Sequence, residues 1–132
     1  MKHLNLPLLL AIATTGLLLI GCLGPEIGPC TGSLTIENPL PDNSVSVEDT
    51  LFVDLANPPV FVSSEGEITY SYSVITGGRY INPAIVANPG DNNKFTNLMI
   101  IGLTKGKATT ELKAVDGCLE NSIRFNTTVI EE

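Results

Sequence analysis

Three cysteines, Cys22, Cys30 and Cys118, are the side chains of this sequence best suited to covalent chemistry. A thiol can accept an acyl group, pair in a disulfide, or act as a nucleophile. A nucleophile needs an activating base, and the single histidine, His3, lies at the start of an apolar N-terminal run. Removal of that run would exclude histidine-based acid–base catalysis, His-paired nucleophiles and His-ligated zinc. Since the sequence also has no GxSxG motif and no phosphate-binding glycine loop, we expect that the protein is not an enzyme.

Cys22 ends the apolar run. Lys2 precedes the run, proline interrupts it, and no basic stop-transfer cluster follows it, as is typical of a cleaved signal peptide. Its last residues, Leu19-Ile20-Gly21-Cys22, resemble the bacterial lipobox. The resemblance implies diacylglycerol transfer to the Cys22 thiol and cleavage after Gly21, which leaves Cys22 as a lipidated N-terminus. The alternative is an ordinary signal peptide or a short N-terminal membrane anchor.

Cleavage would leave about 110 residues, which is the size of a single domain. Loss of Lys2 makes the formal charge one unit more negative than the −7 of the whole chain. This acidity argues against nucleic acid as a partner and leaves membrane attachment to the acyl chains, at about 0.8 kcal/mol per buried methylene. Leu23 is not the aspartate that retains lipoproteins in the inner membrane of some bacteria. We therefore expect a lipid-anchored envelope protein, with the outer membrane or cell surface favoured.

Cys30 and Cys118 remain once Cys22 is acylated. Beyond the inner membrane the compartment is oxidising, and an even number of cysteines favours one disulfide. It would close a loop of nearly ninety residues, which in the chain-entropy model stabilises the fold by roughly 4–5 kcal/mol. Two unpaired buried thiols are the alternative.

Short β-rich runs separated by turn signals fill the rest of the chain and predict an all-β sandwich. In the run 67–75, Ile68, Tyr70, Tyr72 and Val74 alternate with polar residues, as in a half-buried strand. Pro83 predicts an edge or bulge, and Gly106 a turn between the fifth and sixth strands. The run 97–103 is apolar on both faces and is predicted to be central. The seven expected strands lie within residues 33–37, 46–56, 67–75, 80–87, 97–103, 108–116 and 122–130.

The stretch from Ser44 to Ile130 resembles bacterial immunoglobulin-like and cadherin-like domains, with Gly106, Ala114, Asp116 and Phe125 matching their final hairpin motif. The resemblance implies a seven-stranded immunoglobulin-like antiparallel sandwich. We assign residues 1–21 to the signal peptide, 22–32 to the lipidated N-terminus and tether, and 33–132 to this domain. In such a fold the first strand starts beside the loop joining strands six and seven, which would bring Cys30 near Cys118.

Acidic residues in three loops are the remaining candidates for a site. Glu65, Asp91, Asp116 and Glu120 would gather at one end of the sandwich, where their carboxylates could bind calcium. Resemblance to cadherin-like domains supports this through Asp116, but the cadherin DxNDN linker is absent. A solvated acidic face is the favoured interpretation, so we predict no metal and no cofactor.

The function predicted from sequence is a non-catalytic binding or structural module for an unidentified protein or surface polymer. Its alternatives are a calcium-dependent adhesion module and a protease inhibitor similar to chagasin, in whose NPTTG motif Asn57 and Pro58 match. We treat that match as coincident turn chemistry. Only Leu23 to Pro29 would separate the lipid from Cys30, at most about 25 Å of chain, so the Cys118 end should face the membrane and the C-terminus should point away.

Overall fold

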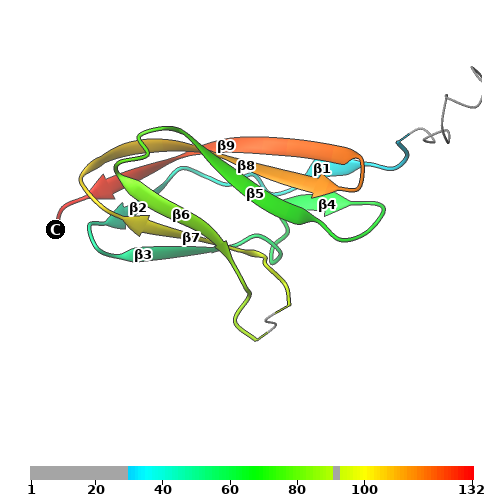
Figure 1. Ribbon diagram of the computed structural model, residues 1–132, viewed down its shortest axis with the longest axis horizontal. Coiled ribbons are helices and arrows are strands. Elements are labelled where there is room, and N and C mark those ends of the chain that lie inside the picture. The colour runs from blue at the N-terminus through cyan, green and yellow to red at the C-terminus, as the bar shows by residue number, and fades with distance from the viewer. Residues whose placement is uncertain (1–29, 91–92) are drawn as a thin grey trace, which may run out of the picture.

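The computed structural model describes residues 30–90 and 93–132, so His3, the lipobox with Cys22, and Asp91 lie outside the described residues. The described chain is an all-β sandwich of nine strands (Figure 1). In chain order the strands are β1 (Leu34–Ile36), β2 (Asn43–Ser46), β3 (Thr50–Asp54), β4 (Phe61–Ser63), β5 (Thr69–Thr76), β6 (Ile81–Val86), β7 (Asn97–Gly102), β8 (Gly106–Asp116) and β9 (Leu119–Ile130). Within those two ranges no helix has the length and apolar character needed to cross a bilayer.

Two sheets form the layers of the sandwich. One has four strands in the order β2-β9-β8-β5, and the other has three in the order β3-β7-β6. β1 and β4 form a separate two-stranded ribbon at one end. β2 runs parallel to β9, whereas the other paired strands are antiparallel. The long β8–β9 hairpin therefore forms the centre of the larger sheet and carries β5 and β2 at its two edges.

The core lies between the sheets and follows from strand alternation. Every second residue of β8 is buried, and β9 continues the pattern with Phe125, Thr127 and Val129. Because successive side chains point to opposite faces, one row fills the core and the other remains outside. The buried apolar residues are Leu34, Val45, Leu55, Val60, Phe61, Ile81, Leu98, Ile100, Ala108, Leu112, Ala114, Phe125 and Val129.

The predicted all-β sandwich is confirmed, and so are two finer predictions. β6, which contains Pro83, is an edge strand, and β7 is central in its sheet. The strand count and the fully antiparallel arrangement were wrong, because the described residues hold nine strands and one parallel pair. The additional strands β2 and β4 have four and three residues, too few for a periodic pattern, and β2 comes directly after the turn-forming sequence Pro41-Asp42.

Gly106 was predicted to form a turn, but the structure places it in a strand. It is the first residue of β8, and a Cβ there would lie 2.4 Å from ring atoms of Tyr80. Glycine is needed at this position because the aromatic ring packs directly on the backbone.

The two ends of the sandwich carry different features. The β8–β9 turn, the β1–β4 ribbon and the start of the described chain lie at one end, whereas the C-terminus lies at the other, at the left of Figure 1. The described placement of Cys30 and the C-terminus at opposite ends agrees with the prediction from sequence.

Candidate functional site

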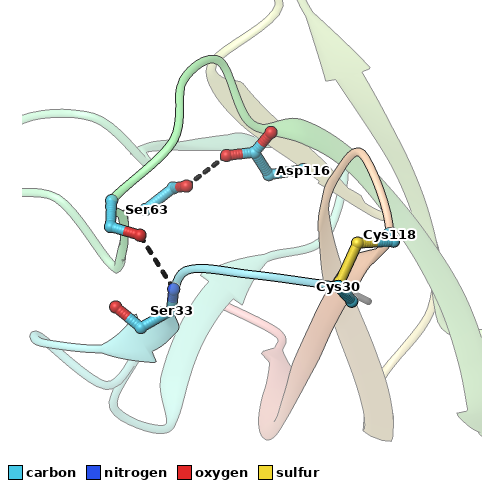
Figure 2. Close-up of a disulfide and its surroundings, with 6 residues drawn as sticks. Cys30, Ser33, Ser63, Asp116 and Cys118 are labelled. Carbon is cyan, nitrogen blue, oxygen red and sulfur yellow. Dashed lines mark hydrogen bonds between the residues drawn. A yellow bond between two sulfur atoms is a disulfide. The ribbon is translucent and has the colours of Figure 1, made fainter. Parts of the chain in front are cut away.

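A disulfide fixes the beginning of the described chain to the β8–β9 turn. Cys30 is bonded to Cys118, and their Cα atoms are 5.9 Å apart (Figure 2). The pairing predicted from cysteine number and topology is therefore confirmed. We call this end of the sandwich the stapled end: Cys30 to Ser33, the β4–β5 loop, and the β8–β9 turn.

Hydrogen bonds extend the attachment beyond the disulfide. The backbone N–H of Ser33 donates to Ser64 Oγ at 2.8 Å, and the N–H of Ser64 donates to the Ser33 carbonyl at 3.0 Å. The Ser63 hydroxyl donates to Asp116 Oδ2, and Asn121 Nδ2 donates to the carbonyl of Leu34 at 3.0 Å. Together these contacts join the N-terminal segment, β4 and the β8–β9 hairpin, and Figure 2 shows the bonds of Ser33 and Asp116 beside the disulfide. The segment from Cys30 to Leu34 is therefore held to the domain by a disulfide and by hydrogen bonds to two other segments.

The described acids that were considered as calcium ligands make other contacts at this end. Asp116 accepts the Ser63 hydrogen bond, and Glu120 forms an ion pair with Lys113 at 3.0 Å. The Glu65 side chain lies against Gly32. Among residues 30–90 and 93–132 no group of three or more candidate ligands is placed to hold a metal ion. The described structure therefore does not bring Glu65, Asp116 and Glu120 together as a ligand set.

An open groove of about 430 Å³ lies beside the stapled end. It is lined by Ala56, Pro59, Phe61, the segment Gly66 to Tyr70, and Asn93 to Thr96. The turn that forms one wall contains a cis Asn57–Pro58 peptide bond. Asp54 Oδ1 accepts hydrogen bonds from the backbone N–H groups of Ala56 and Asn57 at 2.9 and 3.1 Å, which fixes that turn.

The chemistry of this groove suits binding. Phe61 is buried at its base, whereas Phe95 is 58% exposed and offers an open aromatic surface. Burial, and to a lesser extent the Asp54 carboxylate, raises the pKa of Tyr70, so its hydroxyl stays protonated at neutral pH. Glu67 and Lys94 supply one charge of each sign, and the lining contains neither histidine nor cysteine. The groove thus combines apolar surface with a few polar groups, as ligand-binding surfaces do.

Sequence reasoning did not find this groove. Two of its walls, 56–61 and 66–70, are neighbours in the chain, but the third, 93–96, is distant in sequence and only the fold brings it to them. The one available signal was the sequence Asn57-Pro58-Pro59, which indicated a turn but gave no indication of what that turn would face.

Comparison with known proteins gives a fold and no family. No family model matches the sequence, and no curated protein does. Solved structures with a similar fold include a PKD domain from KIAA 1837 protein, at 18% identity and a TM-score of 0.50 over 81% of this chain and 94% of that one. A chimeric titin Z1Z2 gives 16% identity and a TM-score of 0.50 over 78% of this chain and 100% of that one.

A third similar structure is an endo-fucoidan hydrolase of glycoside hydrolase family 107, at 15% identity and a TM-score of 0.51. The match covers 80% of this chain but only 15% of the hydrolase. At these identities the likeness concerns the fold alone. The chain is an immunoglobulin-like β-sandwich, and the fold class predicted from sequence is confirmed.

Proposed function

We propose that this protein is a lipid-anchored component of a bacterial cell envelope whose immunoglobulin-like domain acts as a non-catalytic binding module. The observation that carries the proposal is the Cys30–Cys118 disulfide. Its first cysteine, Cys30, is separated by only seven residues from Cys22, the cysteine of the lipobox-like sequence, and the bond ties the chain to one defined end of the domain.

The disulfide supports an oxidising location. Both of its cysteines are exposed, so burial would not protect the bond from cellular reductants. Exposed structural disulfides persist in the periplasm or outside the cell and are rare in the cytosol. This agrees with export by the N-terminal signal and acylation at Cys22. Outer-membrane or surface attachment, suggested by Leu23, is part of the proposal.

The short tether sets an orientation. Seven residues reach at most about 25 Å when fully extended, so the stapled end would stay close to the bilayer. Glu65 and Glu120 lie at that end and would face the headgroups. Glu132 lies at the opposite end and would point away from the membrane. A partner would then approach the distal loops or the long sides of the sandwich.

Binding, rather than catalysis, is favoured by the residues of the groove. Its aromatic and mixed-charge lining offers contacts for a ligand but holds no histidine or cysteine that could act as base or nucleophile. The calcium-dependent and chagasin-like alternatives gain no such support. Asp116 accepts the Ser63 hydrogen bond and Glu120 pairs with Lys113, and the Asn57–Pro58 turn is bonded to Asp54 of its own chain segment.

The anchor can be tested by labelling cells with an alkyne-bearing fatty acid and analysing the mature protein by mass spectrometry. The expected product begins at Cys22, carries acyl chains, and fractionates with membranes. Cys22→Ser should remove the label and the cleavage, whereas the matched double variant Cys30→Ser/Cys118→Ser should retain the label. A mature chain that begins elsewhere without lipid would overturn the proposal.

The orientation has its own test. Single reactive labels at Glu120 and Glu132 in the membrane-bound protein can be probed with an impermeant reagent from the side that the domain occupies. We expect greater protection at position 120. Greater protection at position 132 would show that the orientation is reversed.

A further inference from the structure

The outer face of the three-stranded sheet is apolar, although the core lies on the other face. In β7, Leu98 and Ile100 are buried in the core, so Met99 and Ile101 point outward. In β3, Phe52 points outward and is 61% exposed, the largest exposed fraction among the described large apolar residues. Ala84 and Val86 of β6 complete what we call the apolar face: Phe52, Ala84, Val86, Met99 and Ile101.

Strand register arranges this face in three rows across β3, β7 and β6. The central row is Phe52, Met99 and Ala84. The row on the distal side is Thr50, Ile101 and Asn82, and the row on the stapled side is Asp54, Asn97 and Val86. Across these nine positions of the described sheet, the only charge is that of Asp54. Five of the nine are apolar and adjoin one another, which makes this patch a candidate for contact with a partner.

We propose that the apolar face binds a second copy of this chain, with a twofold axis parallel to the strands. Two such sheets stack about 10 Å apart with nearly aligned strands. The axis would run along β7, so that β3 of each copy lies over β6 of the other. Phe52 then meets Ala84 of the second copy, a large side chain against a small one, and Met99 meets Met99 on the axis. Once this axis is chosen, the register determines which residues of the two copies meet.

Charges at the rim fit the same axis. At the distal end the Asp49 carbonyl accepts the N–H of Gly102, and the Tyr80 carbonyl accepts the N–H of Leu103. The sequences Glu48-Asp49 and Arg79-Tyr80 therefore lie at the same level on opposite sides of β7. Rotation about the proposed axis places the acidic pair of one copy across from Arg79 of the other. Glu48, Asp49 and Arg79 are all exposed. The Arg79 guanidinium lies 4.7 Å over the Tyr80 ring and donates to the Tyr80 hydroxyl, and Asp49 Oδ1 accepts the Thr50 N–H. Glu48 is therefore the acid of this pair whose side chain has no such local bond among the described residues, and the contact would form on the exposed side of Arg79.

The face is small, and this sets the expected affinity. Three strands spaced about 4.8 Å apart, five or six residues long, give a face roughly 15 Å by 18 Å. A standard stable interface buries ~800 Å² per partner, so we expect dissociation constants in roughly the micromolar to millimolar range. The axis keeps both stapled ends on the same side, which would let two copies on one membrane associate. That advantage depends on the proposed anchoring, whereas the docking surface does not.

The test uses the purified full-length protein as cells produce it, with one added cysteine and a short bismaleimide cross-linker. Met99→Cys lies on the axis and should give a covalent dimer whose yield rises with concentration up to ~1 mM, the upper end of the expected range. Thr109→Cys is the matched control, because Thr109 is half-buried like Met99 but lies on the other sheet. The unmodified chain controls for any reaction at Cys22.

A second substitution should then separate specific pairing from collision. Adding Phe52→Glu to Met99→Cys buries an unpaired carboxylate in the interface and should lower the dimer yield by about tenfold or more. Adding Ile75→Glu, at an exposed apolar residue of β5, should leave the yield unchanged. Equal yields from Met99→Cys and Thr109→Cys, or a chain that sediments as a monomer throughout the series, would overturn the proposal. Neither outcome bears on lipid attachment.

The axis itself is tested by reversing charges. Arg79→Glu should weaken cross-linking through Met99→Cys by placing like charges opposite Glu48 and Asp49 of the second copy, and adding Glu48→Lys should restore part of it. A docked pair with strands running in opposite directions would separate these positions, so the absence of any rescue would exclude the parallel axis.

Discussion

The two sheets of the sandwich bury similar inner faces but differ in what their outer faces present to solvent. On the four-stranded sheet, the outer face carries ion pairs between Arg124 and Glu111 at 2.8 Å and between Lys113 and Glu120 at 3.0 Å. On the three-stranded sheet, the apolar face presents Phe52 and its neighbours with a single charge among nine positions. The inner rows form the core, whereas the outer rows are free to differ, and a cluster of apolar side chains in an outer row points to a contact beyond the monomer.

Polar contacts also connect neighbouring strands across the larger sheet. Thr109 Oγ1 donates to Asn126 Oδ1 at 2.8 Å, and Asn126 donates in turn to Asp42, which lies just before β2. The polar groups named here therefore find their hydrogen-bond and ion-pair partners within one molecule. Among the described residues the apolar face has no comparable network. Asn88 and Pro89 border its stapled-side row, where Asn97 is buried, whereas Phe52 stays exposed. The difference indicates that one side is built for solvent and the other for a partner.

The largest expected effect separates a core phenylalanine from a surface one. Phe125→Ala, at a side chain that is 2% exposed, should lower the free energy of unfolding by about 3–5 kcal/mol. Phe52→Ala should lower it by less than about 1 kcal/mol in the monomer, because Phe52 makes no core contact to lose. Denaturant unfolding at low protein concentration measures both. Equal losses would show that the apolar face belongs to the folding core and would remove the contrast between the faces.

The next effect compares the two sides of the three-stranded sheet. A Cβ on Gly102 would lie 2.4 Å from the Ser46 carbonyl oxygen and 3.1 Å from Val129 Cγ1, so Gly102→Ala should cost about 1–3 kcal/mol by overpacking. Ala84→Val also enlarges a residue of this sheet, but on the outer face, and should change stability by less than about 0.5 kcal/mol. Thermal or chemical unfolding distinguishes them. A large loss for Ala84→Val would mean that its outer position is already covered.

Ala84→Val also tests the proposed contact between Ala84 and Phe52 of a second copy. The added methyl groups would fill the space opposite Phe52 of the second copy, so cross-linking through Met99→Cys should decrease even though the monomer remains stable. A stable variant with unchanged cross-linking would contradict the proposed pairing of Phe52 with Ala84.

A smaller effect concerns the ion pairs on the outer face of the four-stranded sheet. A double-mutant cycle on Arg124→Ala and Glu111→Ala should give a coupling of about 0.2–1 kcal/mol, because the Arg124 side chain is 62% exposed and water screens the pair. The coupling should vanish near 1 M salt, where the Debye length is about 3 Å. Association through the apolar face should persist at that salt concentration. Loss of both together would show that charge, rather than apolar contact, holds the second copy.

Much of the larger sheet could be predicted because its strands alternate regularly. In the predicted strand 122–130, alternation places Ile123, Phe125, Thr127 and Val129 on one face, and the structure buries the last three while Ile123 packs at the margin of the core. Cysteine parity predicted the Cys30–Cys118 bond independently of the strands. These features depend on local pattern or on simple counting, both of which a sequence displays directly.

The remaining features depend on contacts between distant segments. β2 becomes a strand because β9 offers it a parallel edge, and the groove exists because the Asn57–Pro58 turn faces Phe95. β7 gives the clearest case. Its apolar residues on both faces correctly predicted a central strand, but the sequence could not say that no further sheet of the described chain would pack on its outer side. Periodicity shows which faces are apolar, whereas only the fold shows what covers them.

The smallest expected effect lies at Asp42, which is hydrogen-bonded to β9 near the β2 edge of the four-stranded sheet. The backbone N–H of Asn126 donates to Asp42 Oδ1 at 2.9 Å, and the Asn126 side chain donates to both carboxylate oxygens. The backbone bond first, and the side-chain bonds second, lower the pKa of Asp42 below its usual 3.8. A carboxylate whose pKa is lowered by folding contributes stability above pH 3.8, and that stability is lost as the pH falls through the lowered value.

Asp42→Asn should therefore reduce stability slightly at neutral pH and make the unfolding midpoint less dependent on pH below about 4. The change should be small because Asp42 is exposed and water competes for its hydrogen bonds. Denaturant midpoints of the variant and the wild type between pH 2 and pH 7 measure it. Cross-linking through Met99→Cys should be the same with and without Asp42→Asn at pH 7. If Asp42→Asn weakened it as strongly as Phe52→Glu does, the two faces would not act independently, and the separation of a solvent side from a partner side would fail.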